Sequence, residues 1–150
     1  MFKKNLFIDL DNVLVDFQSG INQLSEETKV QFKDRLDEVP GIFGLKKPMP
    51  GAVESFGLLS GKFDTYILST APWENPSAWS DKLLWVKIYM GKAAHKRLIL
   101  THHKNLLKGD FLVDDREKNG AKDFAGDWIQ FGKAPFFGWD EVVNYLMLQA

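Results

Sequence analysis

Two aspartates, Asp9 and Asp11, stand two residues apart directly after the apolar run 6–8. Because side chains alternate between the faces of a strand, we expect both on the same side, with side-chain or backbone oxygens a few ångströms apart. One carboxylate can attack phosphorus to give an aspartyl-phosphate, while a second carboxyl group protonates the leaving oxygen and then activates water. Two acids on one strand suit both steps.

Polar residues also follow three later apolar runs. They are Ser69 and Thr70, then Lys104, and finally the neighbouring pair Asp114 and Asp115. In open parallel sheets ligands bind at the carboxyl ends of the strands, so these residues are expected to be spatial neighbours of the first acidic pair. The pattern predicts one site assembled from four strand ends.

Four carboxylates, those of Asp9, Asp11, Asp114 and Asp115, would crowd together at this edge. Like charges at short range raise one another's pKa and oppose folding, unless a hard cation and a lysine neutralise them. Mg²⁺ prefers oxygen ligands and commonly uses one or two carboxylates together with substrate phosphate. The sequence therefore predicts a magnesium site.

Positive charge and hydroxyl donors stabilise the oxygens of a transferring phosphoryl group. Lys104, Ser69 and the neighbouring Thr70 could serve in this way, and a hydroxyl that caps a helix can also bind phosphate. The chemistry indicated is metal-assisted phosphoryl transfer. An isolated Asp-x-Asp would be weak evidence, because such pairs are common in turns and helix caps.

Short apolar segments alternate with helix-like segments, which predicts an α/β fold with a parallel sheet flanked by helices. The expected strands are 6–8, 65–68, 97–101, 111–113 and 128–131. The expected helices are 52–59, 77–90, 118–125 and 139–148. In the second helix Trp79, Leu83, Val86 and Met90 recur at spacings of three and four, which predicts a stripe facing the core.

Residues 17–49 interrupt this alternation with a polar, helix-like stretch from 19 to 36 and a Gly- and Pro-containing turn region. We interpret them as a small helical cap inserted after the first strand. The expected organisation is a core formed by 1–16 and 50–150, with the cap at 17–49.

The bulk properties exclude several classes of function. A net charge of −1 provides no field that would hold the chain on nucleic acid or an anionic membrane. The absence of cysteine removes disulfides, thiolate zinc sites and a cysteine nucleophile. No signal-like or membrane-spanning apolar run occurs, so we expect a cytoplasmic protein, monomeric or homodimeric, acting on a small molecule.

The ordered set of motifs resembles the haloacid dehalogenase-like phosphatases and, more closely, the 5'(3')-deoxyribonucleotidases. The segments that carry the resemblance are 9–17 (Asp-Leu-Asp-Asn-Val-Leu-Val-Asp-Phe), 50–52 (Pro-Gly-Ala), Ser69, 100–104 (Leu-Thr-His-His-Lys) and 112–116 (Leu-Val-Asp-Asp-Arg). Together they span nearly the whole chain. The resemblance implies a Rossmann-like five-stranded sheet with the strand order 5-4-1-2-3.

The resemblance also implies roles for particular residues. Asp9 would be the nucleophile and Asp11 the acid/base. Ser69, Thr70 and Lys104 would bind phosphate. The metal ligands would be Asp9, the Asp11 carbonyl and an aspartate of the 114–115 pair, with Asp115 favoured. Phe17 and aromatic residues of the cap would contact the nucleoside. Phe43 is the candidate within the cap, and Trp73, which follows Ser69 and Thr70, is a candidate outside it.

The substrate is left open by the residues themselves. Mammalian relatives carry a Gly-Phe-Trp segment in the cap where this sequence has Gly41-Ile42-Phe43-Gly44. A (deoxy)nucleoside monophosphate is the expected substrate, and a sugar phosphate or another small phosphomonoester is the alternative. A catalytically silent binding protein is disfavoured because Asp9 and Asp11 are both present.

A phosphoacceptor receiver domain of signalling proteins is an alternative from a different class. It also combines an acidic pair, an aspartate, a Ser or Thr and a Lys on a parallel sheet. In a receiver, however, the acidic pair follows the first strand and the acceptor follows the third. Here the acidic pair follows the fourth expected strand, so the order of motifs argues against this alternative.

Other chemically capable residues have simpler interpretations. His102 and His103 lack a nearby third nitrogen or sulfur ligand, so a zinc site is not expected. Lys46 and Lys47 are predicted to be solvated surface residues, because lysines usually face water. Most aromatic residues are expected in the core, with Trp73 the exception because it follows Ser69 and Thr70 closely.

Overall fold

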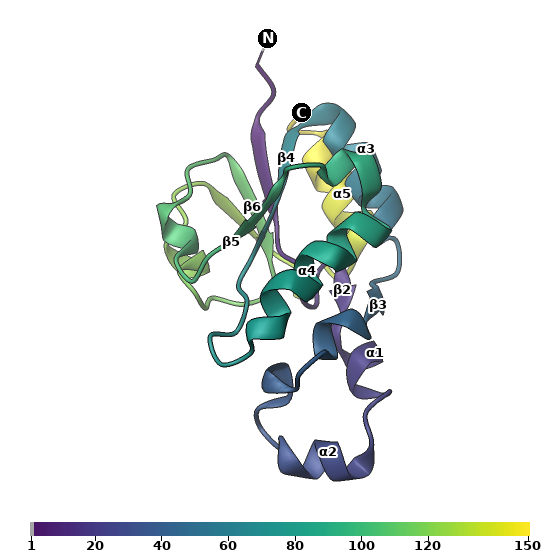
Figure 1. The fold of residues 1–150 in the computed structure, drawn as a ribbon. Helices are drawn as coiled ribbons and strands as arrows, with labels where there is room; N and C mark the ends of the chain where they lie inside the picture. Colours follow the sequence, from purple (N-terminus) through teal and green to yellow (C-terminus); the bar gives the residue numbers. More distant parts are fainter. Residues whose placement is uncertain (1) are drawn as a thin grey trace.

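The structure is a computed structural model that describes residues 2–150. Its centre is a parallel sheet of β1 (Asn5–Ile8), β4 (Asp64–Ser69), β5 (Leu98–Leu100), β6 (Phe111–Asp114) and β7 (Asp127–Gln130) (Figure 1). The strands lie in the order β5-β4-β1-β6-β7. Numbered along the chain and read from the β7 edge, this is 5-4-1-2-3, so the predicted α/β class and strand order are confirmed.

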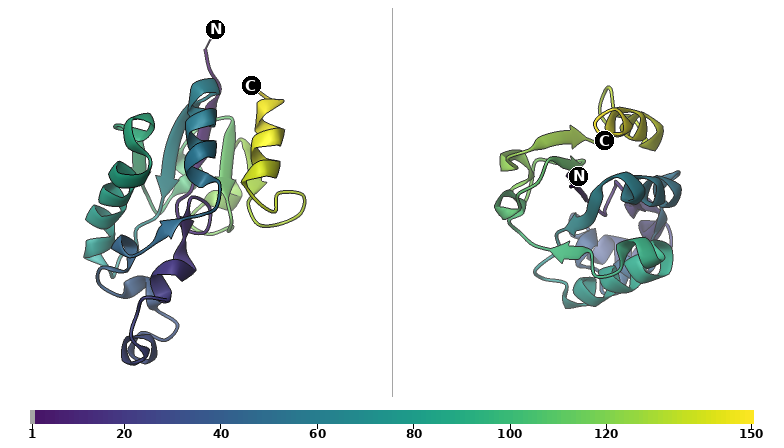
Figure 2. Two further views of the ribbon diagram at one scale, coloured as in Figure 1. Left: turned by 90° about the vertical axis from the view of Figure 1, so that its right-hand side faces the viewer. Right: turned by 90° about the horizontal axis from the view of Figure 1, so that it is seen from above.

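Three helices cover one face of this sheet: α3 (Ala52–Lys62), α4 (Pro76–Tyr89) and α5 (Trp139–Met147) (Figure 2). Leu6 and Ile8 of β1 pack into the same core cluster as residues of all three helices, whereas Phe7 belongs to a separate cluster. This alternation is the period of two expected for a strand that is buried on both faces.

The opposite face is covered by short 3₁₀ turns, η4 (Lys104–Leu106) and η5 (Ala121–Asp123). The predicted helix at 118–125 is therefore wrong. Asn119 and Gly120 have positive φ angles of 55° and 83°, which a right-handed helix cannot contain. A Cβ on Gly120 would lie 2.2 Å from the Asn105 side-chain oxygen, so this close approach also requires glycine.

The segment between β1 and α3 is a string of short elements: β2 (Val15–Asp16), α1 (Phe17–Ile21), α2 (Glu26–Gln31), η1 (Leu36–Glu38), η2 (Ile42–Gly44) and β3 (Lys47–Pro48). The helix-like stretch expected at 19–36 contains two short helices, α1 and α2, each with its own N-cap. The Asp16 carboxylate accepts from the Ser19 amide, and the Ser25 hydroxyl accepts from the Thr28 amide. This segment projects beyond the sheet at the end where β1 finishes (Figure 1).

Helix α4 turns a different face to the core than its apolar spacing predicts. Val86 and Met90 are buried as expected, but Trp79 and Leu83 are exposed. The buried face instead carries Lys82, together with Ala78, Trp85 and Val86. The helix is apolar on two sides, so spacing alone selects the wrong residues.

The chain ends lie together at the end of the sheet opposite the segment 17–49 (Figure 1). The Lys4 ammonium donates a 2.7 Å hydrogen bond to the carbonyl oxygen of Gln149. Within residues 2–150, no helix combines the length and the apolar character that crossing a membrane requires.

Candidate active site

The chain turns sharply after β1 and so brings Asp9 and Asp11 to the edge of the sheet. The Asp9 amide donates to the Val113 carbonyl of β6 (2.9 Å), which fixes the backbone at the predicted nucleophile. Asn12 has a φ of 62°, a left-handed conformation that asparagine tolerates. The amides of Val13, Leu14 and Val15 all donate to the Leu10 carbonyl, so the turn is rigidly hydrogen-bonded.

One group of charges, the core-side cluster, consists of Asp9, Lys104, Asp114 and Asp115. The Lys104 ammonium lies 2.5 Å from Asp114 Oδ2 and 3.1 Å from Asp9 Oδ1. Carboxylate oxygens of Asp9, Asp114 and Asp115 lie within 4.8 Å of one another. Asp115 Oδ1 is buried and has no hydrogen-bond partner. The one lysine of this cluster thus pairs with two of its three carboxylates.

The protonation of the core-side cluster reflects this imbalance. Burial raises the pKa of Asp9 to about 6, against the opposing charge of Lys104. Burial also raises the pKa values of Asp114 and Asp115. Burial alone would lower the pKa of Lys104, but Asp9 and Asp114 outweigh it and raise that pKa. A divalent cation fits this set, because it would neutralise the excess charge and give Asp115 Oδ1 a partner.

A second group, the cap-side cluster, consists of Asp11, Lys46 and Lys82. Lys46 Nζ lies 2.7 Å from Asp11 Oδ1, and Lys82 Nζ lies 2.7 Å from Asp11 Oδ2. Lys82 also donates to Ser69 Oγ at 2.9 Å. Burial alone would raise the pKa of Asp11, but the two ammonium groups outweigh it and lower the pKa to about 2. The Asp11 carboxylate is therefore held ionised.

The predicted phosphate-binding residues lie close to Asp9 and Asp11, the two predicted catalytic acids. Ser69, Thr70 and Lys104 line one small depression together with Asp9 and Asp11. The same depression is bounded by Asp114, Arg116, Lys118 and Asn119. Ser69 is fixed by Lys82, and Thr70 Oγ1 donates to the Thr101 carbonyl at 2.7 Å. The spatial convergence expected from four strand ends is present.

The predicted substrate aromatics lie in a wider cleft, with a volume of about 690 Å³, that opens from Asp11. Phe17, Phe43 and Trp73 all line it. Their exposure differs sharply, because Trp73 is 76% exposed and Phe43 only 3%. The Phe17 and Phe43 rings meet edge to face with centroids 6.0 Å apart. Trp73 therefore offers most of the free aromatic surface.

His102 belongs to this cleft rather than to a metal site. Its ring centroid lies 6.0 Å from those of Trp73 and Trp79. Among residues 2–150, the one cluster of three or more potential metal ligands is Asp9, Asp114 and Asp115, and it includes no histidine.

Sequence reasoning missed two residues of the site, Lys46 and Lys82. The prediction that Lys46 is a solvated surface residue is wrong, because it is 1% exposed and pairs with Asp11. Lys47 is exposed as predicted. Lys82 could have been noticed as a lysine four residues from Ala78 and Val86, within the buried face of α4.

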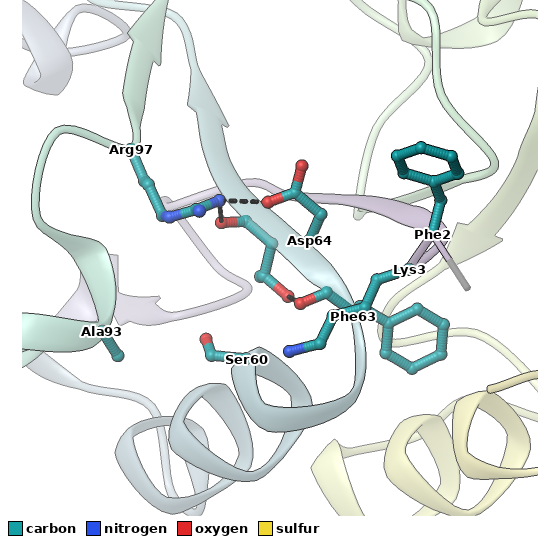
Figure 3. Close-up of a pocket in the computed structure, with 8 residues that line it drawn as sticks. Phe2, Lys3, Ser60, Phe63, Asp64, Ala93 and Arg97 are labelled. Carbon is teal, nitrogen blue, oxygen red and sulfur yellow. Dashed lines mark hydrogen bonds and ion pairs between the residues drawn. The ribbon is translucent and has the colours of Figure 1, made fainter.

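Another pocket, with a volume of about 450 Å³, lies at the opposite end of the sheet (Figure 3). Arg97 and Asp64 form an ion pair there (2.5 Å), close to Ser60 and Phe63. Asp64 begins β4, whereas Ser69 ends it. Because ligands of parallel sheets bind at the carboxyl ends of strands, this pocket is not the candidate active site.

Comparison with known proteins gives a consistent result. Residues 19–136 match the family described as "5' nucleotidase, deoxy (Pyrimidine), cytosolic type C protein". The chain is 58% identical over 144 residues to the "Putative 5'(3')-deoxyribonucleotidase" of Vibrio phage KVP40, covering 96% of this chain and 85% of that one. It is 25% identical over 152 residues to the human "5'(3')-deoxyribonucleotidase, cytosolic type", covering 82% of this chain and 76% of that one.

Solved structures show the same fold. The "putative HAD-hydrolase YfnB from Bacillus subtilis bound to magnesium" superposes with a TM-score of 0.64 at 13% identity, covering 97% of this chain and 99% of that one. A haloacid dehalogenase-like hydrolase from Streptococcus pneumoniae gives a TM-score of 0.57 at 13% identity, covering 95% and 90%. At this identity the likeness concerns the fold alone.

Proposed function

The chain belongs to the family of 5' nucleotidases, deoxy (Pyrimidine), cytosolic type C, a family of phosphatases, and on this premise we propose that it dephosphorylates deoxyribonucleoside monophosphates. The proposal rests on one observation: a single depression is lined by Asp9, Asp11, Ser69 and Lys104. Family membership also removes the receiver-domain alternative.

We propose that the reaction has two steps. An Asp9 oxygen attacks phosphorus, the bond from phosphorus to the ester oxygen breaks, and the leaving oxygen takes a proton from Asp11. Asp11 then accepts a proton from water, which attacks the aspartyl-phosphate, releases phosphate and regenerates Asp9. The negative charge of a phosphate in the depression beside Asp11 opposes the two ammonium groups, raises the pKa of Asp11 and lets it carry the proton.

The phosphate would be held by Ser69, Thr70 and Lys104, all of which line the depression beside Asp9. Lys104 and the donor groups stabilise the equatorial oxygens as negative charge develops on them. Lys82 supports the phosphate-binding residues indirectly. Its ammonium donates to the Ser69 hydroxyl and pairs with the Asp11 carboxylate.

Mg²⁺ would be bound by Asp9, the Asp11 carbonyl and Asp115, with Asp114 adjacent. The free, buried Oδ1 of Asp115 supports it as the direct ligand, since Asp114 is already engaged by Lys104 and by the Arg116 amide (3.2 Å). When bound, the cation would neutralise charge on the transferring phosphoryl group.

The nucleoside would occupy the cleft that carries Phe17, Phe43 and Trp73, beneath a cap formed by 17–49 over a core of 1–16 and 50–150. The cleft is large enough for a nucleoside, since small-molecule sites range over about 300–1,000 Å³. We further propose a cytoplasmic enzyme, monomeric or homodimeric.

The test is a phosphate-release screen with Mg²⁺ over 5'- and 3'-mononucleotides, in deoxy and ribo forms, against sugar phosphates. We expect the highest kcat/KM for deoxyribonucleotides and loss of activity with a chelator. A preference for sugar phosphates would replace the proposed substrate while leaving the phosphatase chemistry intact.

A further inference from the structure

Lys46 is an unusual lysine because its charged end is almost completely buried. Its ammonium lies 3.5 Å from the centroid of the Phe17 ring and 3.4 Å from that of Phe43. Its one carboxylate partner is Asp11 Oδ1, at 2.7 Å. Burying a lysine is costly unless its charge is paired, so this placement indicates a specific role for the ion pair.

The surrounding structure is shaped to hold this side chain. A Cβ on Gly20 of α1 would lie 2.8 Å from Lys46 Cγ, so a larger residue there would displace the lysine stem. The indole nitrogen of Trp85 donates to the Lys46 carbonyl at 3.0 Å. The aliphatic part and the backbone of Lys46 are thus both held in place, and this directs its ammonium against Asp11.

Lys46 contacts Asp11 from outside the depression proposed to bind phosphate. It lines a small internal pocket with Leu10, Val15, Phe43, Lys82 and Trp85. It does not line the depression that contains Ser69 and Lys104. The two oxygens of Asp11 are therefore distinguished: Oδ1 faces Lys46, and Oδ2 faces Lys82, which in turn contacts Ser69.

We propose that Lys46 is a positioning residue that acts through Asp11. By holding Oδ1 it fixes the carboxylate, so that Oδ2, which faces Ser69 through Lys82, is the oxygen that exchanges the proton with substrate and water. Because Lys46 belongs to the 17–49 segment, this contact also ties the position of that segment to the acid/base. The inference rests on the proposed function.

The first experiment compares Lys46→Met with Lys47→Met, whose lysine is adjacent and exposed. We expect Lys46→Met to lower kcat for the best mononucleotide by roughly 10- to 100-fold, the scale of a misplaced catalytic group, with KM nearly unchanged. Lys47→Met should match the wild type. The loss should be smaller for p-nitrophenyl phosphate, whose leaving group needs no proton.

A double-mutant cycle with Asp11→Asn tests whether Lys46 acts through Asp11. In the Asp11→Asn background, adding Lys46→Met should change the residual kcat less than about threefold, because the group being positioned is already gone. A full, multiplicative loss in that background would show that Lys46 acts independently of Asp11. A selective rise in KM would show that it binds phosphate. Either result overturns the inference.

A chemical rescue separates positioning from simple destabilisation. The chain contains no cysteine, so Lys46→Cys carries the one thiol of the protein. Alkylation of the unfolded variant with 2-bromoethylamine attaches an aminoethyl group to sulfur with loss of bromide and restores an ammonium after refolding. We expect kcat to recover at least tenfold over the unalkylated variant, with wild-type protein carried through the same treatment as the control. A refolded, alkylated variant without recovery would contradict the inference.

The outcomes also separate this inference from the proposed function. If wild type and Lys47→Met release no phosphate from any mononucleotide, the proposed function fails. If both are active and Lys46→Met equals them, the proposed function stands and only the role of Lys46 is overturned.

Discussion

The core-side and cap-side clusters lie on either side of one depression and have opposite charge balance. The first has three carboxylates and one lysine, which pairs with two of them; in the second, two lysines pair with one carboxylate. The excess negative charge of the first suits a divalent cation, and the excess positive charge of the second keeps the Asp11 carboxylate ionised. The difference shows that the same two residue types, Asp and Lys, form clusters of opposite charge balance when their numbers are reversed.

Asp9→Asn should have the largest effect, because it removes the nucleophile from the core-side cluster. We expect kcat to fall by roughly 10³-fold or more, the scale seen when a covalent nucleophile is deleted. Initial-rate assays with the best mononucleotide measure this, with circular dichroism to verify folding. Activity that survives Asp9→Asn would contradict the aspartyl-phosphate mechanism.

Asp115→Asn should weaken metal binding more than Asp114→Asn does. We expect roughly a 100-fold rise in the Mg²⁺ concentration needed for half activity in Asp115→Asn, the upper end of effects seen around metal sites. The effect of Asp114→Asn should be smaller, because Asp114 is paired with Lys104. The reverse ranking would make Asp114 the direct ligand.

The two clusters should respond to pH in opposite ways in the metal-free protein. The folded pKa of Asp9 is raised to about 6, so its stabilising contribution is complete below pH 3.8 and is lost as pH rises through 6. The folded pKa of Asp11 is lowered to about 2, so its contribution is complete above pH 3.8 and is lost as pH falls through 2. Each shift corresponds to roughly 2–3 kcal/mol.

Chemical unfolding of wild type, Asp9→Asn and Asp11→Asn between pH 2.5 and 7, in the presence of chelator, measures both contributions. The difference in unfolding free energy between wild type and Asp9→Asn should decrease from pH 4 to 6. The difference between wild type and Asp11→Asn should increase from pH 2.5 to 4. Parallel pH profiles for the two variants would mean that the clusters do not differ in charge balance.

Trp73→Ala should have the smallest effect, since it alters only the cleft. We expect KM for a deoxyribonucleotide to rise roughly 5- to 10-fold with kcat little changed, as for the loss of one aromatic contact with a base. The ratio of KM values for a nucleotide and p-nitrophenyl phosphate measures this. An equal change for both substrates would place the nucleoside elsewhere.

The core-side cluster was largely predictable from sequence, whereas the cap-side cluster was not. Asp9, Lys104 and Asp114 follow strands, and a buried parallel strand fixes both the direction and the edge at which its next residue lies. Lys82 lies on a helix that is apolar on two sides, so its burial depends on which side the sheet covers. Lys46 points inward because Gly20 leaves room for its stem, a tertiary contact that no local pattern records.

The elements of the fold likewise include some that the sequence predicted and some that it did not. The five strands were predicted because strand-forming runs are short, apolar and bounded by polar residues, and their order was predicted from the family resemblance. The helix expected at 118–125 fails at Asn119 and Gly120, and the helix-like stretch expected at 19–36 is divided at a second cap, Ser25. In both cases the backbone conformation at one or two residues overrides the average helical preference of the segment.

The hydrogen bond between Lys4 and Gln149 has a practical consequence for engineering. With both ends of the described chain side by side and remote from the cleft, a short linker could join them and new ends could be opened in the exposed α2 region. Such a circular permutant would keep every strand-end residue in place while reversing the order in which 17–30 and 31–49 emerge during synthesis. Fusion partners or surface tethers at the ends of the described chain would likewise leave the approach to Trp73 unobstructed.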